Sequence, residues 1–128
     1  MRLLLDTHCL LWAVYDEERL SAAAREIIED AGTTLFFSVV SVIEMAIKRA
    51  RNRADFMFEP ERTRRELLDV DYIELAVSGG HALHLRSLPL VHRDPFDRLL
   101  VAQAIEDDLT LMTADVTMSR YAVKTISS

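Results

Sequence analysis

The sequence has little of what marks secreted, membrane-bound or disulfide-stabilised proteins. One cysteine, Cys9, excludes an intrachain disulfide framework and is typical of a reducing compartment. We expect it to be a small buried hydrophobe and not a nucleophile. No apolar run approaches the roughly 18 residues that suggest a membrane span, and the N-terminus has no recognisable signal peptide. We therefore expect a soluble, cytoplasmic protein without a membrane partner.

Glycine, proline and excess positive charge are also scarce. With three glycines and three prolines among 128 residues, most of the chain should form regular structure, and no repeat, linker or domain boundary is visible. We expect a single domain over residues 1–128, long enough to bury a core without disulfides. The net charge of −6 means that binding a phosphate-rich partner requires a cation or a local basic patch.

What the chain does contain is an alternation of short apolar segments with amphipathic ones. Strands are predicted at residues 2–5, 34–40, 72–76, 109–115 and 122–126, and helices at 7–16, 21–31, 41–53, 60–70, 79–88 and 94–108. Short apolar strands that alternate with helices are typical of a parallel sheet covered on both faces. The predicted fold class is therefore α/β.

Four acidic residues fall where predicted strands end or where the next helix begins. Asp6 ends the first strand and Asp115 the fourth, while Glu44 and Asp97 lie in the first turns of their helices. The carboxyl ends of parallel strands share one edge, where such sheets bind ligands. Four carboxylates there would repel one another, and Mg²⁺ or Mn²⁺, which prefer oxygen ligands, would remove the conflict.

Each acid also has a purely structural interpretation. Ser41 and Glu44 have capping-box spacing, and the stretch DPFD at 94–97 has the pattern of a helix start. Asp115 could form a turn after its strand. Asp6 is harder to explain, because a carboxylate between two apolar runs is costly to bury without a partner. Together the acids favour a metal-dependent hydrolytic site in which a bound cation activates water.

Four stretches spread across nearly the whole chain share a recognisable order and spacing: LLLDTHCLLWA, SVVSVIEMAIK, HRDPFDRLLVAQA and LTLMTAD. In these stretches the sequence resembles the PIN-domain ribonucleases, and most closely the VapC-type toxins of bacterial toxin–antitoxin pairs. The resemblance implies a single PIN-like domain, a three-layer α/β/α fold with a central parallel sheet of four to five strands.

The resemblance also implies an activity and partners. Carried over residue by residue, it implies that the metal-binding and catalytic acids are Asp6, Glu44, Asp97 and Asp115. The implied reaction is Mg²⁺- or Mn²⁺-dependent endonucleolytic hydrolysis of RNA by an activated water. A homodimer and a cognate antitoxin protein are the implied partners. Ile43 stands where relatives often carry tryptophan, just before the glutamate.

Three further residues are candidates for the surroundings of the acids. Thr7 and Thr113 stand beside two of them and could orient carboxylates or bound waters, or could bond only to the backbone. Arg98 could contact a substrate phosphate or pair with a neighbour. Asp94 is expected to cap the helix, which leaves Asp97 for the metal.

Histidines and a basic segment complete the list of candidates. The four histidines have no zinc-ligand spacing, so structural or surface roles are expected, with His92 nearest the site. The basic segment within residues 48–65 could steer RNA phosphates, meet an acidic antitoxin segment or form a solvated helix face. Its cations are Lys48, Arg49, Arg51, Arg53, Arg62, Arg64 and Arg65.

Two other functions fit parts of the same pattern. A receiver-type phosphoacceptor domain is also a parallel α/β fold with acids at strand ends. It would need an adjacent acid pair after the first strand and a lysine ending the last one, whereas Asp6 stands alone and Lys124 lies inside the last predicted strand. A non-catalytic PIN-like binding module would be expected to lack one or two of the acids, and all four are present.

Overall fold

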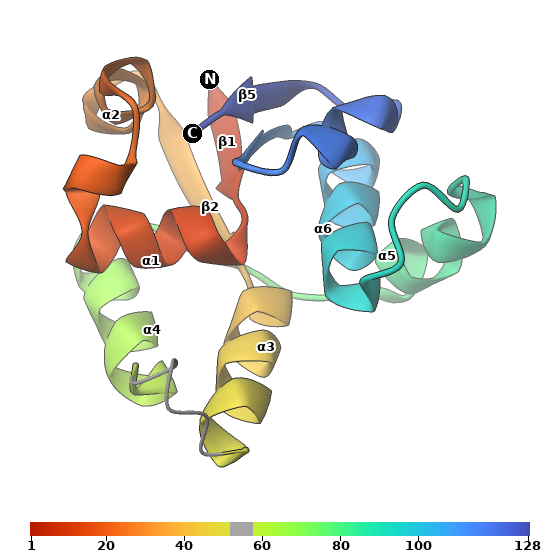
Figure 1. Ribbon diagram of the computed structural model, residues 1–128, viewed down its shortest axis with the longest axis horizontal. Coiled ribbons are helices and arrows are strands. Elements are labelled where there is room, and N and C mark those ends of the chain that lie inside the picture. The colour runs from red at the N-terminus through yellow and green to blue at the C-terminus, as the bar shows by residue number, and fades with distance from the viewer. Residues whose placement is uncertain (52–57) are drawn as a thin grey trace.

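The computed structural model describes residues 1–51 and 58–128, in which one parallel sheet is surrounded by helices (Figure 1). The strands are β1 (Arg2–Leu5), β2 (Thr34–Ser38), β3 (Ile73–Leu75), β4 (Thr110–Thr113) and β5 (Thr125–Ser127). The α-helices are α1 (Thr7–Tyr15), α2 (Ala22–Glu29), α3 (Val39–Ala50), α4 (Pro60–Asp69), α5 (Gly79–His84) and α6 (Pro95–Glu106). Short 3-10 turns are η1 (Glu17–Arg19), η2 (Leu85–Ser87) and η3 (Val116–Arg120). The predicted α/β class is confirmed.

The strands lie in the order β3-β2-β1-β4-β5, and every neighbouring pair is parallel. The chain begins at the centre of the sheet, builds one side, and then returns to build the other. This order differs from the 2-1-3-4-5 order of receiver-type domains. The topology therefore does not support the phosphoacceptor alternative.

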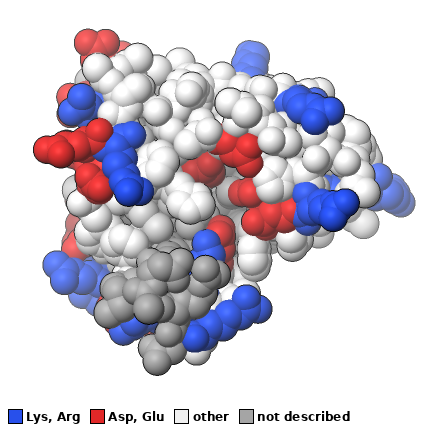
Figure 2. Space-filling model, viewed as in Figure 1, with Lys and Arg blue, Asp and Glu red and all other residues white. Residues whose placement is uncertain are grey.

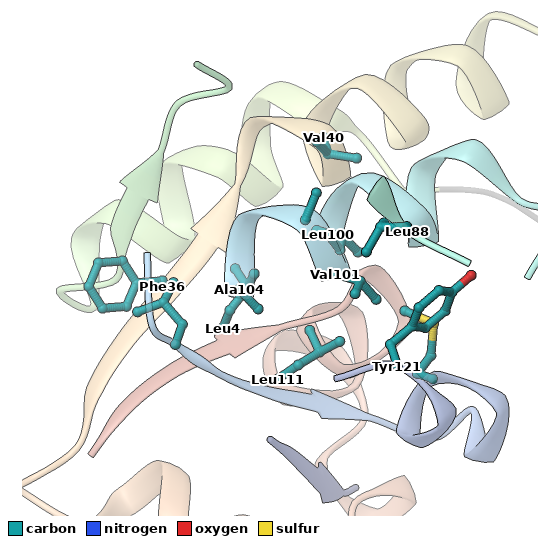
Figure 3. Packing of buried hydrophobic residues seen from close by; sticks show 12 residues of the cluster. Leu4, Phe36, Val40, Leu88, Leu100, Val101, Ala104, Leu111 and Tyr121 are labelled. Atoms are coloured by element: carbon teal, nitrogen blue, oxygen red, sulfur yellow. The ribbon is translucent and has the colours of Figure 1, made fainter. Parts of the chain in front are cut away.

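Two hydrophobic clusters cover the two faces of the sheet and make the fold three-layered. Side chains of a strand alternate between faces, so Leu4 enters one cluster while Leu3 and Leu5 enter the other. The first cluster packs under α6, as Figure 3 shows for Leu100 and Val101. The second is closed by residues of α1, α2 and α4, which lie together on the opposite side (Figure 1).

The start of α3 differs from the sequence prediction. The helix begins at Val39, and its N-cap is Ser38, not Ser41, since the Val40 N–H donates to the Ser38 hydroxyl at 2.9 Å. The two β-branched valines made the segment resemble a longer strand, but the capping serine ends the strand before them. Glu44 therefore lies in the second turn of the helix and not in the first.

The end of the chain also differs in detail from the prediction. β4 ends at Thr113, so Asp115 follows the strand and begins η3, and β5 starts at Thr125 instead of residue 122. None of the helices in the two described ranges combines the length and apolarity needed to cross a bilayer. The end of the predicted helix at 41–53, and with it Arg53, lies outside the described residues.

Candidate metal centre

The carboxyl ends of the central strands form the edge at which the predicted acids gather. The chain leaves β1 through β2 and β3 and later returns to β4, so the sheet order reverses between β1 and β4. Ligands of doubly wound sheets bind in the crevice at such a reversal. Asp6 follows β1 directly and Asp115 lies just after β4, which places both residues at this crevice.

Asp6 is buried at the start of α1, with only 6% of the residue exposed. Its Oδ1 accepts the Cys9 N–H at 2.9 Å, which makes Asp6 the N-cap of the helix. Burial, reinforced by the Asp6 carboxylate, raises the pKa of the Cys9 thiol well above its usual range. The thiol is therefore not a nucleophile at neutral pH, and Cys9 is the small buried hydrophobe that was expected.

Glu44 is held at both carboxylate oxygens. The Thr7 hydroxyl donates to Oε1 at 2.8 Å and also lies 2.9 Å from the Ser41 hydroxyl. Lys48, one turn further along α3, forms an ion pair with Oε2 at 2.9 Å. These contacts fix the direction of a buried carboxylate, and Thr7 occupies the position that was predicted to orient one of the acids.

Asp97 has a strongly shifted pKa. Its pKa is raised from 3.8 to about 7, first by burial and then by the charge of Asp94, with Asp6 and Glu44 acting in the same direction. The neighbouring His92 partly opposes this shift. A buried carboxylate among like charges binds a proton more readily, and a divalent cation could relieve the same repulsion.

The pKa of Asp115 is shifted in the opposite direction to that of Asp97. Burial alone would raise its pKa, but hydrogen bonds from Thr117 and His92 lower the pKa below its ordinary value. Its Oδ1 accepts the Thr117 N–H at 2.9 Å and caps η3, while Oδ2 lies 2.8 Å from His92 Nε2. The Asp115 N–H donates to the Thr113 hydroxyl at 3.0 Å. Of the two roles considered for Thr113, this contact is the hydrogen bond to the backbone.

His92 contacts both Asp97 and Asp115. The sequence predicted that it is the histidine nearest the site, but not that it contacts two of the acids. Its Nε2 lies 3.3 Å from Asp97 Oδ2 as well as 2.8 Å from Asp115 Oδ2. The Asp94 N–H donates to Nδ1 at 3.1 Å, so the ring proton belongs on Nε2, facing the two acids. The backbone N–H of His92 donates to the Tyr121 hydroxyl. The available signal was its place two residues before the start of the capping stretch DPFD.

Three of these side chains could hold a metal ion together. In the described parts of the chain, ligand atoms of His92, Asp97 and Asp115 lie within 4.8 Å of one another. Asp6 and Glu44 are not members of this group, although both act on the charge of Asp97. The structure thus brings all four predicted acids into one region, but only two of them into a compact ligand group.

Arg98 is held by backbone carbonyl groups. Its guanidinium donates to the Leu88 carbonyl at 3.2 Å and, more weakly, to the Leu85 carbonyl at 3.4 Å. These contacts tie the first turn of α6 to η2 and the residue after it. Of the two roles considered for Arg98, the geometry favours pairing with neighbours over contact with a substrate phosphate.

Most cations of the basic segment are matched by carboxylates. In addition to the Lys48–Glu44 pair, the ion pairs are Arg49–Glu59, Arg62–Glu66 and Arg64–Glu74. Across residues 1–51 and 58–128, Arg51 and Arg65 have no carboxylate within ion-pairing distance. The segment is therefore much less positive in the folded protein than its composition suggests.

The surface around the acids is hollowed and strongly acidic. Figure 2 shows carboxylates gathered in a recess near the centre of one face, with blue cationic side chains on either side of it. Such a recess could hold a divalent cation and the phosphate group of a ligand, because the cation offsets the local negative charge. The flanking cations would meet the remainder of a phosphate-bearing chain.

Comparisons with known proteins bear on the fold and the family of the chain. The model of the PIN domain family matches residues 3–124. No curated protein matches the chain.

Solved structures with the same fold cover nearly the whole chain. A chain of the VapBC2 complex from Rickettsia felis, bound to a promoter DNA fragment, superposes with a TM-score of 0.73 at 15% identity, covering 99% of this chain and 98% of that one. A chain of DNA-bound VapBC from Salmonella typhimurium superposes with a TM-score of 0.69 at 14% identity, covering 99% of this chain and 98% of that one. A chain of VapBC-1 from nontypeable Haemophilus influenzae superposes with a TM-score of 0.65 at 18% identity, with the same coverage of both chains. At these identities the likeness shows the fold alone.

Proposed function

The chain belongs to the PIN domain family, and from that premise we propose that it is a divalent-metal-dependent endoribonuclease and the toxin of a toxin–antitoxin pair. The observation that carries the proposal is Asp97, a half-buried carboxylate beside Asp115 whose pKa is raised to about 7, because partial burial and three other acids disfavour its charge. Such a group is poised to exchange its proton for a metal ion near neutral pH.

The donor set suits Mg²⁺ or Mn²⁺. Asp97 and Asp115 offer carboxylate oxygens within reach of one another, and His92 Nε2 lies beside both as a hydrogen-bond donor that would have to give up its proton before it could bind the ion itself. Asp6 and Glu44 add negative charge, and either could hold a water bound to the ion. When bound, the cation would supply a water of lowered pKa and polarise the phosphodiester.

The side chains around the ion have separable roles in this proposal. Thr7 and Lys48 fix both oxygens of Glu44, so this carboxylate can orient a water without moving. His92 Nε2 bridges Asp97 and Asp115 and holds them side by side. Water is the nucleophile, and no protein group forms a covalent intermediate.

Metal removal tests the chemistry. The purified protein should cleave RNA with Mg²⁺ or Mn²⁺, stop in EDTA, and resume when the metal is restored. Mn²⁺ should also raise the thermal unfolding midpoint of the wild-type protein but not that of Asp97→Asn. Full cleavage in EDTA would overturn the proposal.

The toxin role is supported by the fold that the chain shares with chains of VapBC complexes. We expect a neighbouring gene to encode a small antitoxin with a DNA-binding part, and we expect the toxin itself to form a homodimer. Expression of the chain alone should arrest growth, and co-expression of that neighbour should restore growth and yield a co-purifying complex. A protein that binds the neighbour but cleaves no RNA with Mn²⁺ would instead be a non-catalytic binding module.

A further inference from the structure

A second cleft lies directly beside the acidic cluster, between α3 and the start of α6. It has a volume of about 410 Å³, which is within the usual range for small-ligand sites. Its described lining is Glu44, Ile47, Lys48, Arg51, Arg93, Asp94, Pro95 and Phe96. Glu44 belongs both to this cleft and to the acidic region, so the two are continuous.

One wall of the cleft is a single face of α3. Glu44, Ile47 and Arg51 are spaced at i, i+3 and i+7, which places them along one side of the helix end. The rise of an α-helix puts Arg51 about 10 Å from Glu44 along the axis. A polynucleotide whose scissile phosphate lies at the acids would therefore pass Arg51 with a neighbouring nucleotide.

Two arginines face the cleft from opposite walls. Arg51 stands at the C-terminal end of α3, and Arg93 stands just before α6. Both are exposed, and among described residues neither has a carboxylate within ion-pairing distance. They differ in this from Arg49, Arg62 and Arg64, each of which is neutralised by a glutamate.

Apolar side chains complete the cleft. Ile47 lines it from α3, and Phe96 lines it from the first turn of α6 while also packing against the core cluster under α6. A half-buried aromatic ring anchored in the core is a rigid surface on which a base can stack. Two guanidinium groups without a carboxylate partner among the described residues suit the phosphate of a nucleotide, and the aromatic wall suits its base.

We propose that this cleft is the subsite for the nucleotide next to the scissile phosphate, with Arg51 and Arg93 binding its phosphate and Phe96 contacting its base. The inference rests on the proposed ribonuclease function, because the cleft is assigned by its continuity with the acids. Arg51, Arg93 and Phe96 then set how tightly and in what register the RNA lies. The acids alone determine the chemistry.

Binding and cleavage are measured separately to test the subsite. A fluorescein-labelled single-stranded oligoribonucleotide of mixed sequence is titrated with the protein in Ca²⁺, and a gel checks that the RNA stays intact. Arg51→Gln and Arg93→Gln should each weaken binding roughly tenfold and flatten the slope of log K against log salt by about 0.7. Phe96→Leu keeps the apolar volume but removes the stacking face, and should weaken binding roughly tenfold at an unchanged salt slope.

Arg62→Gln is the matched control, because Arg62 belongs to the same basic segment but pairs with Glu66 outside the cleft. If this control weakens binding as much as Arg51→Gln, the attraction is diffuse and the subsite is wrong. Wild-type affinity and salt slope in the two cleft arginine variants, or no binding by the wild-type protein, would also overturn it. If the cleft variants lose binding while the wild type cleaves no RNA, the ribonuclease proposal fails, and the cleft is supported as a nucleotide-binding site but not as a neighbour of a scissile phosphate.

Discussion

Both ends of α6 carry contacts between histidines and carboxylates, yet the two ends differ in kind. At the C-terminal end each imidazole meets one acid. His81 Nε2 lies 2.9 Å from Asp107, and His84 Nδ1 lies 2.8 Å from Glu106. Each of these pairs joins one ring nitrogen to one carboxylate and connects α5 to α6. They are self-contained tertiary contacts.

At the N-terminal end a single imidazole faces several acids. His92 contacts both Asp97 and Asp115, and the charges of Asp6 and Glu44 reach Asp97 as well. The same residue types therefore produce a balanced contact at one end of the helix and an excess of buried negative charge at the other. What marks the candidate site is this excess of carboxylates over partners, not the presence of histidine and aspartate.

The largest expected effect separates the two ends by activity. Asp97→Asn should reduce RNA cleavage by roughly 1,000-fold or more, the scale on which loss of one charge-stabilising group acts. Asp107→Asn makes the same chemical change at the balanced end and should leave the rate within about twofold of wild type. Rates from single-turnover assays with Mn²⁺ decide the comparison, and equal losses would show that α6 is needed only as a scaffold.

The pH dependence of stability should show the same contrast. The folded-state pKa of Asp97 is raised from 3.8 to about 7, so the folded protein binds this proton more tightly than the unfolded chain. Without metal, the free energy of unfolding should therefore fall as pH rises from about 4 to about 7, by at most about 4 kcal/mol. Urea denaturation of wild type and Asp97→Asn across this range measures the contribution, which should be absent in the variant.

Replacement of His81 should affect mainly stability, and replacement of His92 should affect mainly metal binding. His81 is 3% exposed, accepts the Ser78 N–H at Nδ1, and lies against Asp107 at Nε2. His81→Ala removes both hydrogen bonds and empties a buried position, and should lower the free energy of unfolding by about 2 kcal/mol with unchanged Mn²⁺ affinity. His92→Ala should instead change Mn²⁺ affinity more than stability. Urea denaturation and calorimetric titration together measure both quantities, and identical profiles would remove the distinction between the ends.

The smallest expected effect concerns Asp94, which caps α6 by accepting the Phe96 N–H at 2.8 Å. Asp94→Ser keeps a capping hydroxyl, so the free energy of unfolding should change by less than about 0.5 kcal/mol, and cleavage should be largely retained. Because the Asp94 charge helps to raise the pKa of Asp97, the upper midpoint of the pH dependence should move to lower pH. If Asp94→Ser abolishes cleavage while Asp97→Asn does not, the assignment of these two acids is reversed.

The alternation of strands and helices was predictable because it depends on local patterns of apolar, capping and turn residues. The apolar run at β1 ends at Asp6, and the stretch DPFD begins α6 as expected, with Asp94 as its cap. The start of α3 was not predictable locally. The hydroxyl of Ser38 donates to Gln103 of α6, 65 residues away, and this contact fixes a cap that β-branched neighbours obscure. His92 was assigned only a vague position for a similar reason, because it lies in a loop without a periodic pattern.

The amino-acid sequence alone dictates that acids follow the apolar strands, and any parallel sheet built from those strands brings them to one edge. Only the folded protein decides how they interact there. The tertiary structure partly buries Asp97 and places His92 between Asp97 and Asp115, while Thr7 and Lys48 hold Glu44. Desolvation and Coulomb energies depend on distances between segments that lie far apart in the chain. No local pattern of residues specifies those distances.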